Sequence, residues 1–519
     1  MRKRYFAPLV LVVAALSLAV SFGTSSAQST GGATAGATAG TLRVGAAQGI
    51  PQLNPVIRTF AWEEVLFPLL WAGLTKWTPS GATAPDLATS WVGAKDSKTW
   101  TFKLRGGVKF SNGDPLTATD VVKTFNYYLA PKTVSQETNR INMVSSVRAV
   151  NPTTVLFRLK TANALFPTAI INVKIVKTDD LANFSKNPIT TGPYKVANFV
   201  PDSSVSLVRN DGYFGAKAKL DRIEIVRAAD PTAATAALLS GDLDVMWGLP
   251  ALQAQKVSQE PGGSVKLVTP RAASQSPFWE ADTTSPPFNN VKNRQALAYA
   301  IDRQTILKTA FAGLGVVSPT NTLLSVNNPS YGAPAGSKLI NYSYNLAKAK
   351  KLFAEGGLKS GSTLTWWSTP ALPEFRTQGL ILQASLAKIG IKLVIQENEV
   401  ATWVAKFYPG GKKFPGLIVP NANSGPVEAA YNFNFYLPKR CECNWSPANF
   451  NRLYAKAIQT ADPKKRIQAW HQVQAVENRQ VPIWVPLQAQ IASAVRKSVT
   501  GAWVEGGGQL HIESAANSG

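Results

Sequence analysis

The sequence is short of acidic residues. It has 30 Asp and Glu against 54 Lys and Arg, which gives a formal net charge of +24. The number of Lys and Arg is close to that of an average soluble protein, so the imbalance comes from missing acids. The basic runs are short and scattered, whereas proteins that follow phosphate backbones gather their charge on one face or arm. We therefore expect no nucleic-acid partner.

Histidine and cysteine are also scarce, which excludes several kinds of site. His471 and His511 are the only histidines, and the sequence has neither an HExxH nor a GxSxG motif. Cys441 and Cys443 are the only cysteines, and two thiols without a neighbouring His do not complete a zinc site. We expect no catalytic residues, no metal and no cofactor. The cysteines are expected to form a local disulfide, with free thiols as the alternative.

No apolar run is long enough to cross a membrane, because none reaches about 18 residues. The run Leu9–Val20 follows Arg2, Lys3 and Arg4 and precedes small residues, which is the order of a secretory signal peptide. We expect residues 1–27 to be this signal peptide and residues 28–41 to be a flexible linker. No Cys follows the expected cleavage point to carry a lipid anchor. The mature chain is then expected to be soluble in the periplasm.

Two segments have the strand–helix–strand pattern of βαβ units. Each has an apolar strand, a helix with a Pro near its start or a Gly at its end, and a second strand. The strands and helices expected here are Asp221–Ala228, Asp230–Ser240 and Asp242–Trp247 in one unit, and Thr363–Ser368, Glu374–Ile389 and Ile391–Glu397 in the other. Two such units predict parallel sheet in two separate places, and therefore two α/β lobes.

Between and around these units lie further elements. Trp100–Leu104 alternates like a strand, and Thr117 with Asp120 forms the capping box of a helix that follows it. A helical stretch is expected over 292–312, with a new start at Asp302. Another is expected over 452–478, with an interruption at Asp462-Pro463, before a return to strand over 482–489.

Aromatic and amide residues stand at the carboxyl ends of the expected strands. In open parallel sheets, ligands bind in the crevice beyond these ends. A strand over Gly416–Val419 is expected to end in a loop, Pro420–Ser424, which carries two Asn residues. Rings and amides at strand ends predict an uncharged, hydrogen-bonding cleft, although any single Trp is as readily a core residue. The predicted solute-binding residues are Trp247, Trp279, Trp366, Trp367, Asn421, Asn423 and Trp445.

The order of short motifs along the chain resembles the peptide/nickel-type extracytoplasmic solute-binding proteins of family five, which feed ABC importers. The matching motifs run from about Leu42 to Ile512. They are Leu53–Pro55, Pro85–Trp91, TWTFKLRGGVKFSNGDPLTATDV from Thr99, Thr191–Tyr194, Arg209–Tyr213, Ser240–Asp244, Pro286–Phe288, Asn293–Arg303 and Pro482–Leu487.

The resemblance implies an α/β fold, a two-lobed periplasmic-binding-protein clamp with mixed sheets, a hinge cleft and an extra α+β subdomain on lobe I. It divides the chain into lobe I (42–75, 190–285 and 482–516), the subdomain (76–189) and lobe II (286–481). It also implies a monomer that closes on a solute without a covalent step and docks on a membrane permease.

One departure from the family bears on the solute. Members that take peptides place an Asp after the strand that corresponds to Gly416–Val419, where this chain has Asn423. Because an unpaired buried ammonium costs several kcal/mol, a peptide N-terminus needs another partner here. We expect an oligopeptide, with a neutral oligosaccharide as the alternative; nickel is not expected without a cluster of soft ligands. The alternatives from other classes are a secreted hydrolase with paired carboxylates in the cleft, and a scaffold protein without a ligand.

Overall fold

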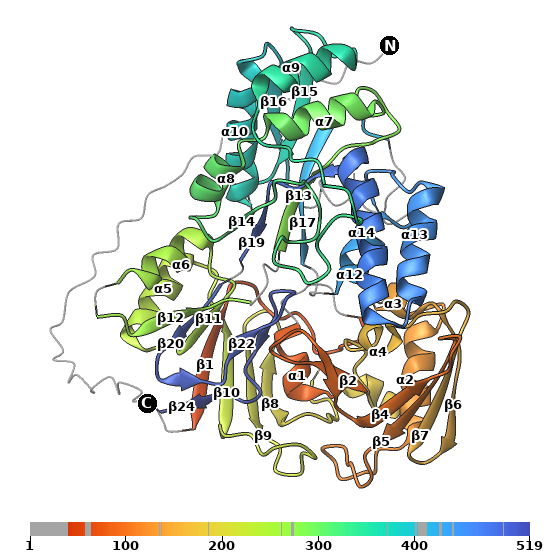
Figure 1. Cartoon of the computed structure of the whole chain (residues 1–519). Coiled ribbons are helices and arrows are strands. Elements are labelled where there is room, and N and C mark those ends of the chain that lie inside the picture. The colour runs from red at the N-terminus through yellow and green to blue at the C-terminus, as the bar shows by residue number, and fades with distance from the viewer. Residues whose placement is uncertain are drawn as a thin grey trace, which may run out of the picture. The chain divides into compact units, whose positions relative to one another are not determined.

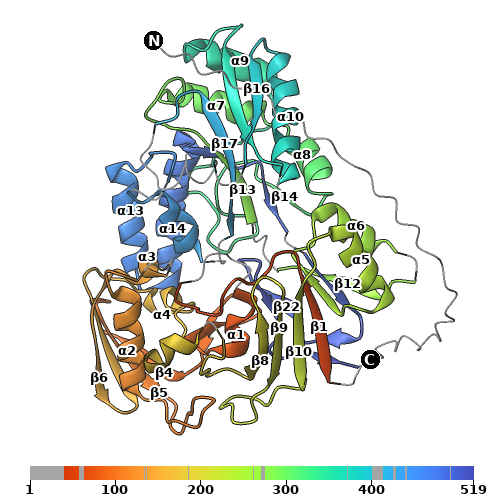
Figure 2. The same cartoon turned by 180° about the vertical axis from the view of Figure 1, so that it is seen from behind.

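Two seven-stranded sheets divide the described part of the chain, and each has its own core (Figures 1 and 2). The structure is a computed structural model. It describes residues 40–518 except 58–63, 134, 136, 185, 261, 271–274, 371, 400, 401, 403–412, 425–427, 439, 440 and 491. The expected signal peptide and nearly all of the expected linker lie outside these residues, and the first strand begins at Thr41.

The first sheet has the order β12-β20-β11-β1-β10-β9-β8. Its strands are β1 (Thr41–Ala46), β8 (Tyr194–Val200), β9 (Ser204–Arg209), β10 (Arg222–Arg227), β11 (Val245–Trp247), β12 (Val265–Val268) and β20 (Ser493–Arg496). β1 lies between β10 and β11 and is parallel to both, which confirms the first βαβ unit. The unit's helix α5 (Pro231–Ser240) begins at Asp230, whose carboxylate accepts a hydrogen bond from Ala233 N at 2.7 Å. Helix α6 (Ala251–Ser258) packs beside it.

The second sheet has the order β14-β19-β13-β17-β15-β16, with β18 paired to β13. Its strands are β13 (Gln275–Glu280), β14 (Gly315–Val317), β15 (Thr363–Ser368), β16 (Lys392–Glu397), β17 (Leu417–Ser424), β18 (Ile483–Trp484) and β19 (Leu487–Ala489). β15 and β16 are parallel, as the second βαβ unit predicts. The helices of this lobe include α7 (Val291–Ala300), α8 (Arg303–Ala310), α9 (Leu346–Glu355) and α10 (Pro373–Ala387), and α10 is the helix of the βαβ unit. Asp302 caps α8, which confirms the predicted restart.

The sheets differ from the expected lobe boundaries at two places. β13, β18 and β19 lie in the stretches 190–285 and 482–516, which were assigned to lobe I, yet they pair in the second sheet. The chain therefore passes between the lobes after β12 and again before β20. The Pro286-Pro287 pair, where the sequence indicated a boundary, instead precedes α7 inside lobe II.

Within residues 76–189 lies a four-stranded antiparallel sheet, β4-β5-β7-β6, with helix α2 (Ala118–Leu129) against it. The strands are β4 (Ala88–Gly93), β5 (Thr99–Leu104), β6 (Val144–Asn151) and β7 (Thr154–Leu159). The capping box of Thr117 and Asp120 is present at the start of α2, as predicted. Phe157 joins the layers, because its ring lies 5.4 Å from that of Phe102 on β5 and 4.8 Å from that of Phe125 on α2.

Three helices, α12 (Ala429–Phe433), α13 (Ala448–Gln459) and α14 (Pro463–Gln480), lie beside the second sheet and reach this subdomain (Figure 1). The break between α13 and α14 falls at the predicted Asp462-Pro463. Ala164 N donates to Ile458 O at 2.8 Å, and Tyr431 Oη donates to Thr168 O at 3.1 Å. The remaining elements are α1 (Phe67–Leu70), β2 (Thr75–Trp77), β3 (Thr83–Pro85), α3 (Thr138–Ile141), α4 (Phe166–Ala169), η2 (Thr178–Asn183), η3 (Asn434–Tyr436), β21 (Val499–Thr500), β22 (Trp503–Val504), β23 (Leu510–His511) and β24 (Ala516–Asn517).

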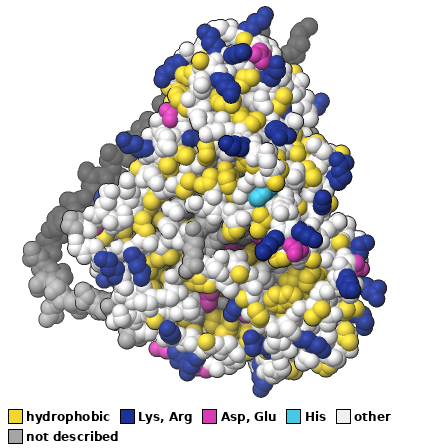
Figure 3. Space-filling view, in the orientation of Figure 1, with side chains coloured by type: hydrophobic (Ala, Val, Ile, Leu, Met, Phe, Trp, Pro, Cys, Tyr) yellow, Lys and Arg dark blue, Asp and Glu magenta, His cyan; other side chains and the backbone are white. Residues whose placement is uncertain are grey.

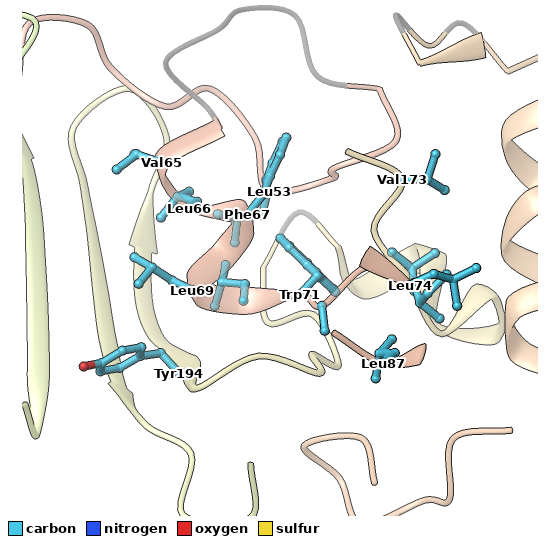
Figure 4. Close-up of a cluster of buried hydrophobic side chains, with 14 of the residues drawn as sticks. Leu53, Val65, Leu66, Phe67, Leu69, Trp71, Leu74, Leu87, Val173 and Tyr194 are labelled. Carbon is cyan, nitrogen blue, oxygen red and sulfur yellow. The ribbon is translucent and has the colours of Figure 1, made fainter. Parts of the chain in front are cut away.

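The surface charge and the core follow the composition. Figure 3 shows Lys and Arg side chains spread over the visible face rather than gathered in one patch. Around α1, Leu66, Leu69 and Trp71 pack with Tyr194 of β8, so that one core runs from the first sheet towards the subdomain (Figure 4). None of the helices in the described part of the chain has the length and apolar content that a bilayer crossing requires.

Candidate functional site

Strand β17 lies at the centre of the candidate site because it changes partner along its length. Its first residues run parallel to β15, with Leu417 opposite Thr365, and the rest runs antiparallel to β13, with Asn421 opposite Phe278. The expectation that Pro420–Ser424 is a loop is therefore wrong: these residues continue the strand, because β13 provides a second edge for pairing. Asn423 lies opposite Ser276 in this register.

The predicted solute-binding residues on the second sheet lie on two opposite faces of it. Trp279 and Trp366 share one face, where both are fully buried and their rings meet edge to face at 4.9 Å. Trp279 Nε1 donates to Gln378 Oε1 of α10 at 2.8 Å. These contacts favour the core role that the sequence allows for each Trp, and solute binding by either ring remains a prediction.

The opposite face carries Trp367 and Asn421. Trp367 is buried against Phe414 and Val419, and its Nε1 donates to Gln396 Oε1 at 2.9 Å. Trp445 belongs to the same side, because it lies in one buried cluster with Phe278. The structure thus brings Trp367, Asn421 and Trp445 to one side of the second sheet.

Trp247 lies apart from the other six, at the end of β11 in the first sheet. It is buried, and its indole Nε1 donates to Gly508 O at 3.4 Å. Solute contacts from both lobes were expected, and Trp247 is the one predicted residue that the first sheet contributes.

Behind Asn421 lies a group of buried acids and sulfurs that we call the acid–sulfur cluster: Glu280, Cys441, Glu442 and Cys443. Asn421 Nδ2 donates to Glu280 Oε1 at 3.0 Å, and Glu280 Oε2 lies 3.8 Å from Cys441 Sγ. The two cysteines form a disulfide, which confirms the favoured alternative. Asn444 follows in the left-handed conformation (φ 55°), so that the chain turns back directly after Cys443.

The two carboxyl groups of the cluster affect one another. Burial raises the pKa of Glu280 well above its usual value, and the nearby Glu442 raises it further. Burial raises the pKa of Glu442 too, and a hydrogen bond joins the two carboxyl groups. Two adjacent carboxylates in a dry environment cannot both ionise readily, which is why the proximity of Glu442 adds to the effect of burial on the pKa of Glu280.

Asp282 stands two residues beyond Glu280 in a different environment. Burial alone would raise its pKa, but hydrogen bonds from Ser285, Asn444 and Thr284 outweigh burial and lower the pKa below its usual value. Asn444 Nδ2 donates to Asp282 Oδ1 at 2.9 Å, which attaches the cysteine turn to the segment after β13. Asp282 is therefore an anchor for the turn.

A second group of buried charges lies in lobe I. A cavity there leaves about 50 Å³ in which the centre of a water molecule can move, and Lys76, Asp86, Lys174, His511 and Glu513 are among the residues that line it. Burial raises the pKa of Asp86 and lowers that of Lys174. These groups connect the C-terminal segment to the stretch around β2.

The sequence reasoning missed Glu280, Glu442 and Asp282. Glu442 stands inside the Cys-Glu-Cys motif, and the other two stand in the run Trp-Glu-Ala-Asp that ends β13. Acids at the end of an apolar strand are a usable signal. The sequence does not show that β13 pairs with β17, however, and only this pairing places Glu280 beside Asn421.

Comparison with known proteins agrees with this architecture. The sequence profile of bacterial extracellular solute-binding proteins, family 5 Middle, matches residues 82–437. The glutathione-binding protein GsiB of Escherichia coli (strain K12) is 26% identical over 445 residues, which cover 80% of this chain and 83% of GsiB.

Two solved structures have the same fold. CtaP of Listeria monocytogenes, an ABC transporter substrate-binding protein, has a TM-score of 0.80 and 25% identity, and the match covers 93% of this chain and 100% of CtaP. AgaA of A. tumefaciens R10, solved with agropinic acid, has a TM-score of 0.77 and 26% identity, over 92% of this chain and 99% of AgaA.

These likenesses and the two sheets define a two-lobed periplasmic-binding-protein fold, as the motifs predict. The profile match covers more than half of the sequence. The chain belongs to the bacterial extracellular solute-binding proteins of family 5, which serve ABC importers. The relatives named here are binding proteins rather than enzymes.

Proposed function

We propose that this protein captures a short peptide between its two lobes and presents it to the permease of an ABC importer. The observation that carries the proposal is the arrangement of the two connections between the sheets. Val268 and Ser493 pair where the connections leave the first sheet, and Gln275 and Ala489 pair where they enter the second. Two adjacent connections form one hinge, about which the lobes rotate with little change in either core.

Closure then follows from binding alone. A solute that touches both lobes has more contacts in the closed form than in the open form, so it shifts the population towards closure by that difference in affinity. Trp247 on the first sheet and Asn421, Asn423 and Trp367 on the second are the proposed solute contacts. No covalent step is required, and the solute leaves unaltered.

A peptide is favoured over an oligosaccharide by the relatives. GsiB is named for glutathione, a tripeptide, and matches most of this chain. AgaA was solved with agropinic acid, so the fold also accepts solutes that are not peptides. We further propose that residues 1–27 are removed as a signal peptide and that the mature protein acts as a monomer in the periplasm.

The test is a panel of di- to pentapeptides and neutral oligosaccharides in thermal unfolding, followed by solution scattering. A true solute at about 100 times its Kd should add about 2.7 kcal/mol to the free energy of unfolding and reduce the radius of gyration. Mass spectrometry of the recovered solute should find it intact. The proposal fails if no compound in the panel stabilises the protein, or if the solute is recovered cleaved.

Residue variants locate the site. Asn423→Ala and Trp247→Ala should weaken solute binding while the unliganded protein still unfolds cooperatively. Ser80→Ala is the matched control, because Ser80 is exposed on the turn between β2 and β3. A variant that binds as tightly as the unaltered protein removes that residue from the proposed site.

A further inference from the structure

The acid–sulfur cluster has the composition of a metal site. One oxygen of Glu280 and the sulfurs of Cys441 and Cys443 all lie within 4.8 Å of one another, and all three residues are buried. The sequence alone does not place Glu280 beside the two sulfurs, because Glu280 is more than 160 residues away from Cys441. The fold therefore supplies what the sequence motif lacks.

The spacing suits tetrahedral coordination. With a metal–sulfur distance near 2.3 Å and a metal–oxygen distance near 2.1 Å, the two ligand atoms lie about 3.6 Å apart. Glu280 Oε2 and Cys441 Sγ are 3.8 Å apart. Glu442 is hydrogen-bonded to Glu280 but lies outside this group of ligand atoms, so it can orient Glu280, and a water takes the fourth position.

In the described part of the chain, no basic side chain pairs with the carboxyl group of Glu280 or Glu442. No Lys, Arg or His of that part of the chain forms an ion pair with Glu280 or Glu442; Lys439 and Arg440 lie outside the described residues. Asn421 Nδ2 fixes Glu280 Oε1, which leaves Oε2 directed towards the sulfurs. Such a contact to a ligand's second oxygen is how proteins orient metal-binding carboxylates.

The disulfide itself contributes little to holding the fold together. It joins residues only two apart, and a cross-link that closes so short a loop restricts the unfolded chain least. Asp282 and Asn444 hold the turn in place independently of the sulfur–sulfur bond. Reduction should therefore leave both sulfurs beside Glu280.

We propose that reduction of the Cys441–Cys443 disulfide converts the acid–sulfur cluster into a tetrahedral site for a thiophilic divalent cation of the Zn²⁺ class. A dithiol or phosphine reductant supplies two electrons, the sulfur–sulfur bond breaks, and each cysteine gains one electron and one proton. The cation then displaces the two thiol protons, together with any proton on the Glu280 carboxyl group, and binds two thiolates and the Glu280 carboxylate, with a water in the fourth position. In the oxidised protein the sulfurs are bonded to one another and are not available as thiolate ligands.

The test is a Co²⁺ titration of the full-length protein, freed of metal by a chelator, with and without phosphine reduction. Cysteine occurs only at 441 and 443, so any thiolate-to-cobalt charge-transfer absorption reports this site. The reduced protein should bind one Co²⁺ per chain with this absorption, and Zn²⁺ should displace it. The oxidised protein should show no such absorption.

Three variants complete the experiment. Glu280→Gln and Glu442→Gln should each weaken Co²⁺ binding at least tenfold in the reduced protein, with circular dichroism unchanged. Glu374→Gln is the control, because Glu374 is a half-buried acid at the start of α10, outside the acid–sulfur cluster, and the variant should bind Co²⁺ like the unaltered protein. The absence of thiolate absorption after reduction, unfolding of the reduced protein, or equal affinity in Glu280→Gln would each overturn the proposal. Solute binding by the oxidised protein is a separate measurement, so the two proposals fail independently.

Discussion

At the residue scale, the buried charges of the C-terminal segment determine how stability depends on pH. His511 lies between two carboxylates, with Nε2 3.2 Å from Glu505 Oε2 and Nδ1 3.1 Å from Glu513 Oε1. Trp503 stacks on its ring at 3.8 Å. Burial alone would lower the pKa of His511, but Glu513 and Glu505 outweigh it and raise the pKa to about 9.

A pH titration of stability checks this assignment. Since the pKa of His511 is higher in the folded state than its usual value of about 6.5, the stabilisation is complete below pH 6.5 and is lost as pH rises through 9. We expect a loss on the order of 3 kcal/mol between pH 7 and pH 10 in chemical unfolding. His511→Gln should remove this dependence, whereas His471→Gln should retain it.

Glu477 depends on pH for a different reason. Its Oε1 accepts hydrogen bonds from Tyr436 Oη at 2.7 Å and Leu323 N at 3.0 Å, but burial raises its pKa to about 8. The folded state thus holds a proton that the unfolded state releases near pH 4.5, and stability falls as pH rises from 4.5 to 8.

Glu477→Gln tests this directly, because the amide retains the accepting oxygen without the titration. Relative to the unaltered protein, the variant should gain stability between pH 5 and pH 8.5, by at most about 5 kcal/mol. Glu355→Gln, at a surface ion pair with Lys292, should show no such trend. A parallel pH dependence in Glu477→Gln and the unaltered protein would contradict the assignment.

At the element scale, local sequence patterns predicted where individual helices and strands begin, but they did not predict which distant strands pair. The strand over Trp100–Leu104, the capping box at Thr117 and the restart at Asp302 are all set by neighbouring residues, and the structure has them. The length of β17 was not predictable, because its second half exists only where β13 pairs with it.

The same limit applies to the candidate site. Alternation along β15 shows that Trp366 and Trp367 face opposite sides, but not which side is the core. That choice depends on α10, which packs against one face only. The sequence thus indicated β15 and the first half of β17, which the structure has, but could not sort their residues by face or place Glu280 beside them.

Gly379 permits the close approach of α10 to β15. A Cβ at this position would lie 2.6 Å from Trp366 Nε1, which is too close for van der Waals contact. The Trp366 ring also packs on Trp279, so it cannot move away without disturbing that contact. Gly379→Ala should therefore lower the free energy of unfolding by about 1–3 kcal/mol in denaturant titrations. Gly106→Ala, where no atom lies within 4 Å of the added Cβ, should change it by less than about 0.5 kcal/mol.

At the scale of the whole molecule, the subdomain of residues 76–189 contacts the helices of lobe II directly. Tyr431 Oη donates to Thr168 O, and the Arg140 guanidinium lies over the Tyr431 ring at 4.7 Å. Glu137 pairs with Arg140 at 3.0 Å and holds the guanidinium in place.

Loss of one such contact should weaken solute binding from a distance. Tyr431→Phe removes a hydrogen bond worth about 1 kcal/mol between the subdomain and lobe II. Under the proposed closure this bond forms as the lobes come together, so solute Kd should rise about fivefold. Tyr344→Phe is the control, because the Tyr344 hydroxyl bonds to Ser385 within lobe II. Calorimetric titration measures both, and an unchanged Kd in Tyr431→Phe would show that this contact does not favour closure.

The paired ends at the hinge also define how the gene could be divided. Gln275 lies opposite Ala489, so the chain enters and leaves the second lobe at the same place. The second lobe is therefore arranged as a domain inserted into the first lobe. Val268 of β12 and Ser493 of β20 are antiparallel partners. A short turn between these two residues would therefore join β12 to β20 as a hairpin and leave the first sheet continuous without the second lobe. Each half therefore has its own pair of chain ends lying side by side.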